Sequence, residues 1–234
     1  MAYLDIYWKE YLKAIYQYGE DHTKDDTKIR QYYGYHQTIP APPLLNSLQN
    51  IHYDKQKIFL QQVKNGEYNL QGYPIKDEAL YQYVTAWDKD EMIQCKEFIY
   101  TYPERIFNYP QNQYEIIKNR LQHNIGSNRG VAVLYNPEID KERKDIPCLN
   151  WLQATVDENN NLRLHCMFRS NDIYGAWPSN MLLLSYLGFQ LVDDLNNLGD
   201  FIRDIRFHSI DYHCSCAHYY KTDEEAVKNI IGVK

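Results

Sequence analysis

The chain has 234 residues, of which 44% are apolar and 15% aromatic, enough for one large domain with a well-filled core or for two small domains. A net charge of −6 argues against a protein that mainly coats nucleic acid, but it is compatible with a local basic pocket for one small anion. No apolar stretch approaches the roughly 20 residues that span a bilayer, and the N-terminal residues do not have the pattern of a secretory signal. We therefore expect a cytoplasmic protein.

Apolar residues recur at helical spacing in three segments of the first half of the chain, 3–18, 76–87 and 113–125. Between the helical segments, the sequence predicts a charged loop at 21–31 and a proline-rich connection at 38–47. The aromatic segment 97–110 favours a strand up to its prolines.

The second half changes to β-rich runs, at 129–137, 148–157, 162–170 and 200–220. The sequence DENNN after the second run predicts a turn, so that run and the next should form a hairpin or lie as near neighbours. Residues 180–195 are long and apolar enough for a buried helix, and 222–231 predict a closing helix with Thr222 as its N-cap and Glu225 three positions later. Without internal repeats or linkers, the pattern predicts a single α/β (α+β) domain over residues 1–234 with a largely buried sheet.

The five cysteines are odd in number and irregularly spaced, which is typical of reduced cytosolic thiols rather than of a disulfide framework. Cys214 and Cys216 could suggest a metal site. However, no second pair of cysteine or histidine residues stands at a zinc-finger spacing, so we interpret them as small, half-buried side chains and expect no bound metal.

Cys148 follows a proline and opens the apolar run CLNWLQATV. A cysteine at the start of a strand is either a small buried hydrophobe or a nucleophile, and a nucleophilic thiolate needs positively charged neighbours to ionise. Taken alone, Cys148 has the position of a structural cysteine more often than of a catalyst.

The segment FRSNDIYGAWPSN places Arg169, Ser170, Asp172 and Asn180 within thirteen residues. Its arginine and serine could hold a phosphate, because a guanidinium offers paired donors and a hydroxyl adds a third. The spacing alone is more typical of a strand end and loop that are held by side-chain hydrogen bonds.

Two further positions interrupt apolar or aromatic surroundings. Arg129 precedes a predicted strand, where an ordinary surface arginine is the alternative. In the run AHYY, His218 and Tyr220 would point to the same side of a strand, where a packed, hydrogen-bonded histidine is the usual interpretation.

Together these blocks resemble the thymidylate synthase family, in the compact form found in archaea and some phages. YTYPERI is similar to the family's Tyr-Gly-x-Gln/Arg block, SNRGVAVLYNPEID to its Ser-Arg-Arg strand followed by Trp-Asn-Pro, and PCLNWLQ to its Pro-Cys-x-x-x-x-Gln block. RSNDIYGAWPSN resembles its Arg-Ser-x-Asp loop with the following Pro and Asn, and AHYY its His-x-Tyr. The blocks occur in family order from about Tyr100 to the C-terminus, whereas the first hundred residues match poorly.

The resemblance implies a thymidylate synthase-like fold, with a large mixed sheet flanked by helices, in a homodimer. It also implies a reaction, the methylation of dUMP to dTMP with 5,10-methylenetetrahydrofolate as cosubstrate. A thiolate that adds to C6 of the pyrimidine makes C5 enolate-like, so that C5 can attack the methylene carbon of the folate. Covalent catalysis thereby splits one hard step into easier ones.

The family's residue roles fall on matching positions of this chain. Cys148 falls on the nucleophile and Tyr102 on the tyrosine linked to removal of the C5 proton, while Asp172 falls on a contact to the folate pterin. The implied substrate-binding residues are Arg129, Gln153, Arg169, Ser170, Asn180, His218 and Tyr220. Within that set, the arginines hold phosphate, Arg129 across a dimer interface, and the asparagine reads the pyrimidine edge. The His-x-Tyr pair binds the ribose hydroxyl.

The chain departs from the family pattern at several positions. Leu149 replaces the histidine that usually follows the nucleophile, and Asn128 removes one arginine of a pair. The N-terminal phosphate loop is not recognisable, which leaves a lysine or arginine of the segment 24–30 to substitute. Glu78 is the best match to the catalytic glutamate, and Trp87 then becomes an aromatic wall for the folate.

Two other functions remain open from the sequence. A pyrimidine-nucleotide hydroxymethylase on dUMP or dCMP would use the same scaffold and nucleophile, with water capturing the C5-methylene intermediate. A non-catalytic nucleotide-binding relative is the third candidate, although the presence of both Cys148 and Arg169 argues against it.

Overall fold

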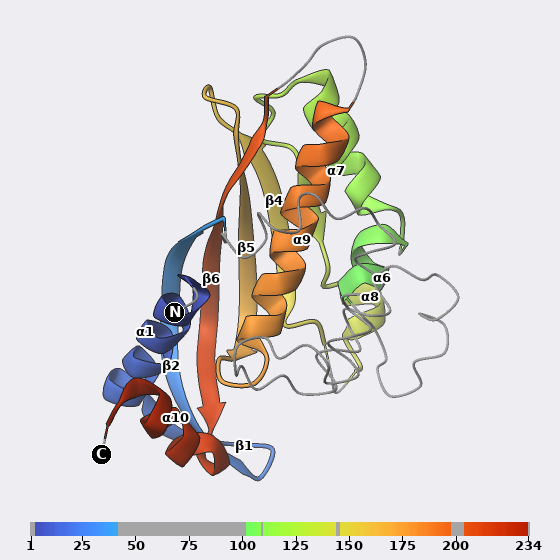
Figure 1. The fold of residues 1–234 in the computed structure, drawn as a ribbon. Helices are drawn as coiled ribbons and strands as arrows, with labels where there is room; N and C mark the ends of the chain where they lie inside the picture. Colours follow the sequence, from blue (N-terminus) through green and yellow to red (C-terminus); the bar gives the residue numbers. More distant parts are fainter. Residues whose placement is uncertain (1–2, 42–101, 109, 144–145, 198–203, 234) are drawn as a thin grey trace, which may run out of the picture.

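A computed structural model describes residues 3–41, 102–108, 110–143, 146–197 and 204–233. Six strands form one sheet in the order β1-β2-β6-β5-β4-β3 (Figure 1). Their bounds are β1 Glu20–Lys24, β2 Thr27–Pro40, β3 Val131–Val133, β4 Leu149–Val156, β5 Asn161–Asp172 and β6 Arg206–Tyr220. All neighbouring strands are antiparallel except β5 and β6, which are parallel, so the sheet is mixed.

Helices flank this sheet, and the expected α/β (α+β) fold class is therefore confirmed. Their bounds are α1 Tyr3–Tyr18, α6 Tyr102–Phe107, α7 Gln113–His123, α8 Pro137–Asp140, α9 Trp177–Asn196 and α10 Glu224–Ile231, with a short 3₁₀ turn, η1, at Lys221–Asp223. None of the helices in the described ranges is long and apolar enough to cross a membrane.

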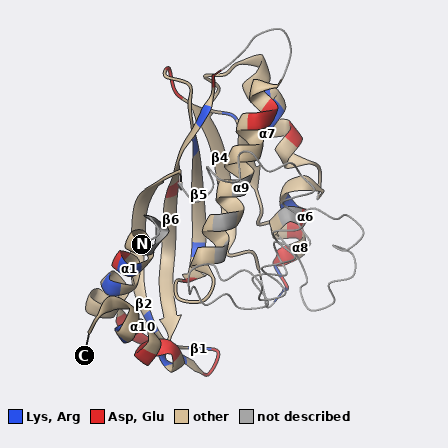
Figure 2. Ribbon diagram, viewed as in Figure 1, with Lys and Arg blue, Asp and Glu red and all other residues tan. Residues whose placement is uncertain are grey.

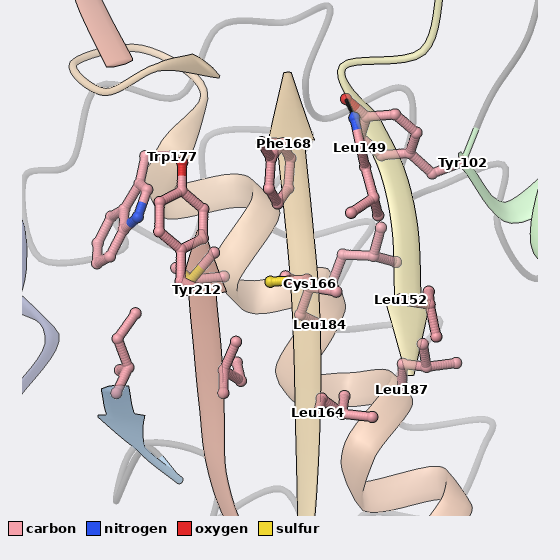
Figure 3. Packing of buried hydrophobic residues seen from close by; sticks show 14 of the residues in the cluster. Tyr102, Leu149, Leu152, Leu164, Cys166, Phe168, Trp177, Leu184, Leu187 and Tyr212 are labelled. Atoms are coloured by element: carbon pink, nitrogen blue, oxygen red, sulfur yellow. Dashed lines mark hydrogen bonds between the residues drawn. The ribbon is translucent and has the colours of Figure 1, made fainter. Parts of the chain in front are cut away.

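The long helix α9 makes the parallel pairing of β5 and β6 possible, because parallel neighbours need a crossover connection between them. It lies across the sheet in Figure 1, with α7 alongside it. Leu184 and Leu187 of α9 pack with Leu164 and Leu152 of the sheet, and all four side chains are at most 4% exposed (Figure 3). Burying a leucine side chain contributes about 2 kcal/mol to stability. These leucines therefore hold β4, β5 and α9 together.

The described helices gather on one face of the sheet. Helix α1 contacts β2, β6 and α9, while α9 and α7 contact the central and far strands. Within the described part of the chain, no helix packs on the opposite face. That face carries the half-exposed residues His165 and Asp211 and the exposed Met167, whose exposed fraction is 39%.

Several predicted elements are confirmed. The helices expected at 3–18, 113–125 and 180–195 match α1, α7 and α9, although α9 begins three residues earlier, at Trp177. The strands expected at 148–157, 162–170 and 200–220 correspond to β4, β5 and β6, and the DENNN turn does join β4 to β5 as an antiparallel hairpin. The helix expected at 76–87 lies outside the described residues.

The charged loop expected at 21–31 is wrong, because these residues form the β1–β2 hairpin, and β2 continues to Pro40 into the expected proline-rich connection. Asp25 and Asp26 both have positive φ, 47° and 64°, which the tight two-residue hairpin turns require. Aspartate tolerates this conformation better than most residues do. The hairpin is largely exposed, so it lacks the apolar alternation by which strands are recognised.

Three local predictions are also corrected. Helix α6 occupies 102–107 of the aromatic segment, whereas its residues 97–101 lie outside the described residues, and the run 129–137 contributes only the three residues of β3. Thr222 lies inside the 3₁₀ turn, so Asp223 takes the N-cap position of α10 instead, without a side-chain capping bond.

Candidate active site

Cys148 stands immediately before β4, half-buried, on a segment that Arg169 of β5 holds in place. The Arg169 backbone N–H donates to the Cys148 carbonyl at 2.8 Å. Its guanidinium donates to the two preceding carbonyls, from Nη2 to Ile146 at 2.7 Å and from Nε to Pro147 at 3.2 Å. Three consecutive carbonyls thus accept from one arginine, which brings the predicted nucleophile and the predicted phosphate ligand together.

Cys148 differs from the two fully buried cysteines of the sheet. Burial raises the pKa of the Cys166 and Cys214 thiols, the latter to about 11, so both remain protonated at neutral pH. Cys148 is half-buried and forms no disulfide. It is therefore better placed than either of them to meet a ligand. Of the pair expected to be half-buried, Cys216 is so, whereas Cys214 is fully buried. In the described ranges, no group of three or more His, Cys, Asp or Glu residues is arranged to hold a metal ion.

Tyr102 approaches the same segment from helix α6. Its hydroxyl oxygen accepts a hydrogen bond of 3.3 Å from the backbone N–H of Leu149, the residue after Cys148 (Figure 3). Its ring meets Phe168 of β5 edge-on, with 6.4 Å between the ring centroids. The structure thus places Tyr102 beside the residue that follows Cys148. Leu149 itself is fully buried in the core.

Ser170, His218 and Tyr220 meet where β5 and β6 end side by side. Ser170 Oγ lies 3.3 Å from His218 Nδ1, and the His218 and Tyr220 rings are edge-to-face with 5.5 Å between centroids. His218 is the parallel-strand partner of Asp172, so the four predicted residues lie at one end of the sheet.

Asp172 shapes the loop that leads from β5 into α9. One carboxylate oxygen, Oδ1, accepts from the backbone N–H groups of Tyr174 and Gly175, each at 3.1 Å. The Asp172 carbonyl accepts from the Ala176 N–H at 3.0 Å. These bonds set the position from which α9 starts.

Asn180 lies in the first turn of α9 and is 8% exposed. Its Nδ2 donates to Oδ1 of Asn171 at 3.1 Å, and Asn171 Nδ2 donates to the Tyr212 hydroxyl at 2.8 Å. Sequence reasoning missed Asn171 and Tyr212. The available signal was an amide at the variable position of the Arg-Ser-x-Asp block, inside a strand that is otherwise buried.

Gln153 and Arg129 are not part of this cluster within one chain. Gln153 stands five residues beyond Cys148 on β4, which is about 16 Å at the usual rise of a strand. Its Nε2 donates to the Asn128 carbonyl at 2.6 Å. Arg129 is exposed in the turn before β3, and its carbonyl accepts from the Arg120 guanidinium.

Two predicted residues, Glu78 and Trp87, lie outside the described residues. Of the basic residues considered for the N-terminal phosphate loop, Arg30 is already engaged. Its guanidinium donates to the Ile15 and Tyr16 carbonyls and to Asp21. It therefore ties β2 to the end of α1, which is a structural role.

Charge is distributed unevenly over the described part of the molecule. Acidic and basic residues alternate along the outer helices and the β1–β2 turn, whereas the central strands carry few charges (Figure 2). On β5 the arginines are Arg163 and Arg169, at opposite ends of the strand. Of these two arginines, Arg169 is thus the one at the Cys148 end.

Curated proteins with related sequences come from methanogenic archaea. The chain is 30% identical over 162 residues to a protein named "Putative thymidylate synthase" from Methanothermobacter marburgensis, which spans 69% of this chain and 67% of that protein. A protein of the same name from Methanosarcina barkeri is 28% identical over 159 residues, 63% of this chain and 69% of its own. One from Methanocaldococcus jannaschii is 35% identical over 127 residues, 50% of this chain and 55% of its own. No protein-family model matches the chain.

Proposed function

This chain belongs to the thymidylate synthase family, and we propose that it is a thymidylate synthase that converts dUMP to dTMP with 5,10-methylenetetrahydrofolate. The observation that carries the proposal is the convergence on Cys148. The three groups come from separate elements. They are a half-buried thiol, an arginine bonded to the backbone carbonyls of Cys148 and of the two residues before it, and a tyrosine hydroxyl bonded to the backbone N–H of the residue after it.

In the proposed mechanism the Cys148 thiolate adds to C6 of the uracil ring, and the electron pair of the C5–C6 double bond moves onto C5 and O4. Arg169 stabilises the thiolate by its charge and keeps the segment before β4 fixed, so that the sulfur is held in one position. The same guanidinium then neutralises the nucleotide phosphate, for which planar paired donors are suited.

The nucleophilic C5 forms a bond to the one-carbon unit that methylenetetrahydrofolate supplies together with the hydride for its reduction. Tyr102 removes the C5 proton, for which its hydroxyl is placed beside the residue after Cys148. As that proton leaves, the bond between the one-carbon unit and the folate nitrogen breaks, and a hydride from the resulting tetrahydrofolate reduces the unit to a methyl group, which leaves dihydrofolate. Loss of the Cys148 sulfur from C6 restores the C5–C6 double bond and releases dTMP. Glu78 completes the proton transfers in this proposal.

The remaining residues position the two substrates. Ser170, His218 and Tyr220 hold the sugar and phosphate at the joint end of β5 and β6, and Asn180 reads the uracil edge. The loop carboxylate Asp172 and the aromatic Trp87 contact the folate.

We further propose a homodimer that forms through the sheet face without a described helix. Met167, Val133 and Tyr33 have exposed fractions of 39%, 51% and 54%, unusual for apolar and aromatic side chains of a sheet. The distance of Arg129 and Gln153 from Cys148 of the same chain supports their use at the partner's phosphate. An exposed arginine at a strand turn is accessible for that purpose.

The test is a product analysis of the full chain with methylenetetrahydrofolate and either dUMP or dCMP. We expect dTMP and dihydrofolate in equal amounts from dUMP, identified by mass, and no product from a Cys148→Ser variant that still folds. A 5-hydroxymethyl nucleotide without dihydrofolate would identify a hydroxymethylase instead. Nucleotide binding without any product would show a non-catalytic relative.

A further inference from the structure

Two asparagines and a tyrosine form a buried chain of hydrogen bonds that ends at Asn180. Asn180 Nδ2 donates to Asn171 Oδ1, and Asn171 Nδ2 donates to Tyr212 Oη, over 3.1 and 2.8 Å. The exposed fractions of Asn180, Asn171 and Tyr212 are 8%, 2% and 0%. Away from water, polar groups depend on one another for hydrogen bonds, so reversing one member leaves its neighbour mispaired.

The backbone around this chain is fixed on both sides. The Asp172 turn sets the loop before α9, and the N–H of Ile173 donates to the His218 carbonyl at 2.7 Å. Trp177, the first residue of α9, packs edge-on against the Tyr212 ring, with 6.5 Å between centroids. The end of β5 and the start of α9 therefore hold Asn171 and Asn180 at a set separation.

We propose that Asn171 determines the choice between uracil and cytosine nucleotides by fixing the orientation of the Asn180 amide, an inference that rests on the proposed function. An amide nitrogen carries two donors, and Asn171 takes one of them. On nucleotide binding, the other donor and the Asn180 oxygen would meet uracil O4 and N3–H. Asn171 is a positioning residue in this scheme, because it does not touch the nucleotide.

Cytosine would require the reverse arrangement, since its N3 accepts and its amino group donates. Reversing Asn180 alone would set its oxygen against the oxygen of Asn171. Reversing both amides would require the Tyr212 hydroxyl to donate to Asn171 instead of accepting from it.

The experiment measures the dissociation constants of dUMP and dCMP by calorimetry for the full chain, without folate, in three variants. Asn171→Leu removes the amide at nearly the same size, Asn171→Asp keeps an acceptor, and Tyr212→Phe removes only the second link. We expect the native chain to prefer dUMP by about tenfold or more, because a mispaired buried polar group costs at least that much. The preference should fall by about tenfold in Asn171→Leu, persist in Asn171→Asp and be intermediate in Tyr212→Phe.

If Asn171 had only a structural role, its substitution would weaken the binding of dUMP and dCMP equally and leave the ratio of their dissociation constants unchanged. An unchanged ratio in Asn171→Leu and Tyr212→Phe therefore overturns the inference while the proposed function stands. If Asn171→Leu does not fold, the contrast between Asn171→Asp and Tyr212→Phe decides the same question.

A native chain that binds neither nucleotide overturns the proposed function but leaves the positioning of the Asn180 amide by Asn171 to be tested separately. Side-chain amide NMR separates the two failures, because it needs no nucleotide. The Asn180 amino protons should be protected from exchange in the native chain and lose that protection in Asn171→Leu. Equal protection in both would refute the positioning role directly.

Discussion

The two ends of the β4–β5 hairpin use similar residues for different purposes. At the closed end, Asp157 Oδ1 accepts from the backbone N–H groups of Asn159 and Asn161, two and four residues away, in an exposed turn. At the open end, Ser170 reaches His218 and Asn171 reaches Tyr212, 48 and 41 residues away, in buried positions. Polar residues at the closed end only complete a local turn, whereas those at the open end bring distant segments to one point.

This difference explains why the open end is the candidate active site. A turn needs one carboxylate and a residue that tolerates positive φ, such as Asn160 at 60°. Burying several polar groups from different elements is costly unless each finds a partner, so such a cluster persists where its geometry serves a function.

The largest expected effect is that of Cys148→Ser at the open end. Oxygen is a much weaker nucleophile than sulfur at neutral pH, so turnover should fall by several orders of magnitude while dUMP binding and the far-ultraviolet circular dichroism remain. Asn159→Ser at the closed end is the control, and its turnover should equal that of the native chain. Substantial turnover by Cys148→Ser would remove the covalent mechanism.

The two arginines of β5 allow a direct comparison of the ends. Arg163 lies 3.7 Å from Asp157 in a part-exposed pair, whereas Arg169 bonds to the carbonyls before Cys148. We expect Arg169→Ala to lower kcat/KM by at least about a hundredfold, because charge-assisted bonds are lost both to the Cys148 segment and to the phosphate. Arg163→Ala should change kcat/KM less than about twofold, since exposed ion pairs contribute little. An equal loss of kcat/KM in both variants would contradict the placement of Arg169 in the active site.

A third comparison concerns the dimer dissociation constant, for a charge placed either on the sheet face without a described helix or in the β4–β5 turn. Met167→Lys places a charge in the proposed dimer interface twice, once from each subunit, and should raise the dimer dissociation constant by at least about a hundredfold. Asn159→Lys adds the same charge in the exposed turn and should leave it unchanged. Sedimentation at micromolar concentration distinguishes the two, and a native chain that is an active monomer would refute the dimer.

Much of this architecture follows from the sequence. The β-rich runs that form β4 and β5, the DENNN turn between them and the apolar length of α9 predicted those elements. The resemblance placed Cys148, Arg169 and Ser170, and the structure brings these positions together at one sheet end.

Other parts could not be predicted for physical reasons. The β1–β2 hairpin has largely exposed faces and therefore no apolar pattern by which its strands could be recognised. The bond between Asn171 and Asn180 depends on where α9 begins relative to β5. That relation is set by the Asp172 turn and cannot be read from spacing alone.

A smaller effect, on the pH dependence of stability, is expected from His213 on the sheet face without a described helix. Burial, followed by the neighbouring His36 ring at 4.2 Å, lowers the pKa of His213 below its usual value of 6.5, although Asp211 acts in the opposite direction. The unfolded chain then binds a proton more readily than the folded chain. Stability contributed by neutral His213 is present above about pH 6.5 and is lost as the pH falls below it.

His213→Gln should reduce that loss of stability between pH 7 and pH 5, as measured by urea unfolding at each pH. If the free energy of unfolding changes with pH equally in His213→Gln and in the native chain, protonation of this histidine is not coupled to folding.

The smallest effect belongs to the closed end. The backbone and side chain of Asn161 donate to Asp157 and lower the pKa of its carboxyl group. The stability from the ionised turn is present at pH 7 and is lost as the pH falls from about 3.8 through the lowered pKa. Asp157→Asn should therefore be slightly less stable than the native chain at pH 7, approach it in stability at pH 2 to 3, and turn over dUMP at the native rate.

The central claim is that Cys148 forms a covalent bond to the pyrimidine. The most direct measurement is the intact-protein mass after incubation with methylenetetrahydrofolate and 5-fluoro-dUMP. This nucleotide carries fluorine in place of the C5 hydrogen that the reaction must remove as a proton, so the reaction stops at the covalent adduct. The account predicts a mass increase equal to both ligands, located by peptide mapping on Cys148 and absent from Cys148→Ser. An unmodified chain, or an adduct on another cysteine, would contradict it.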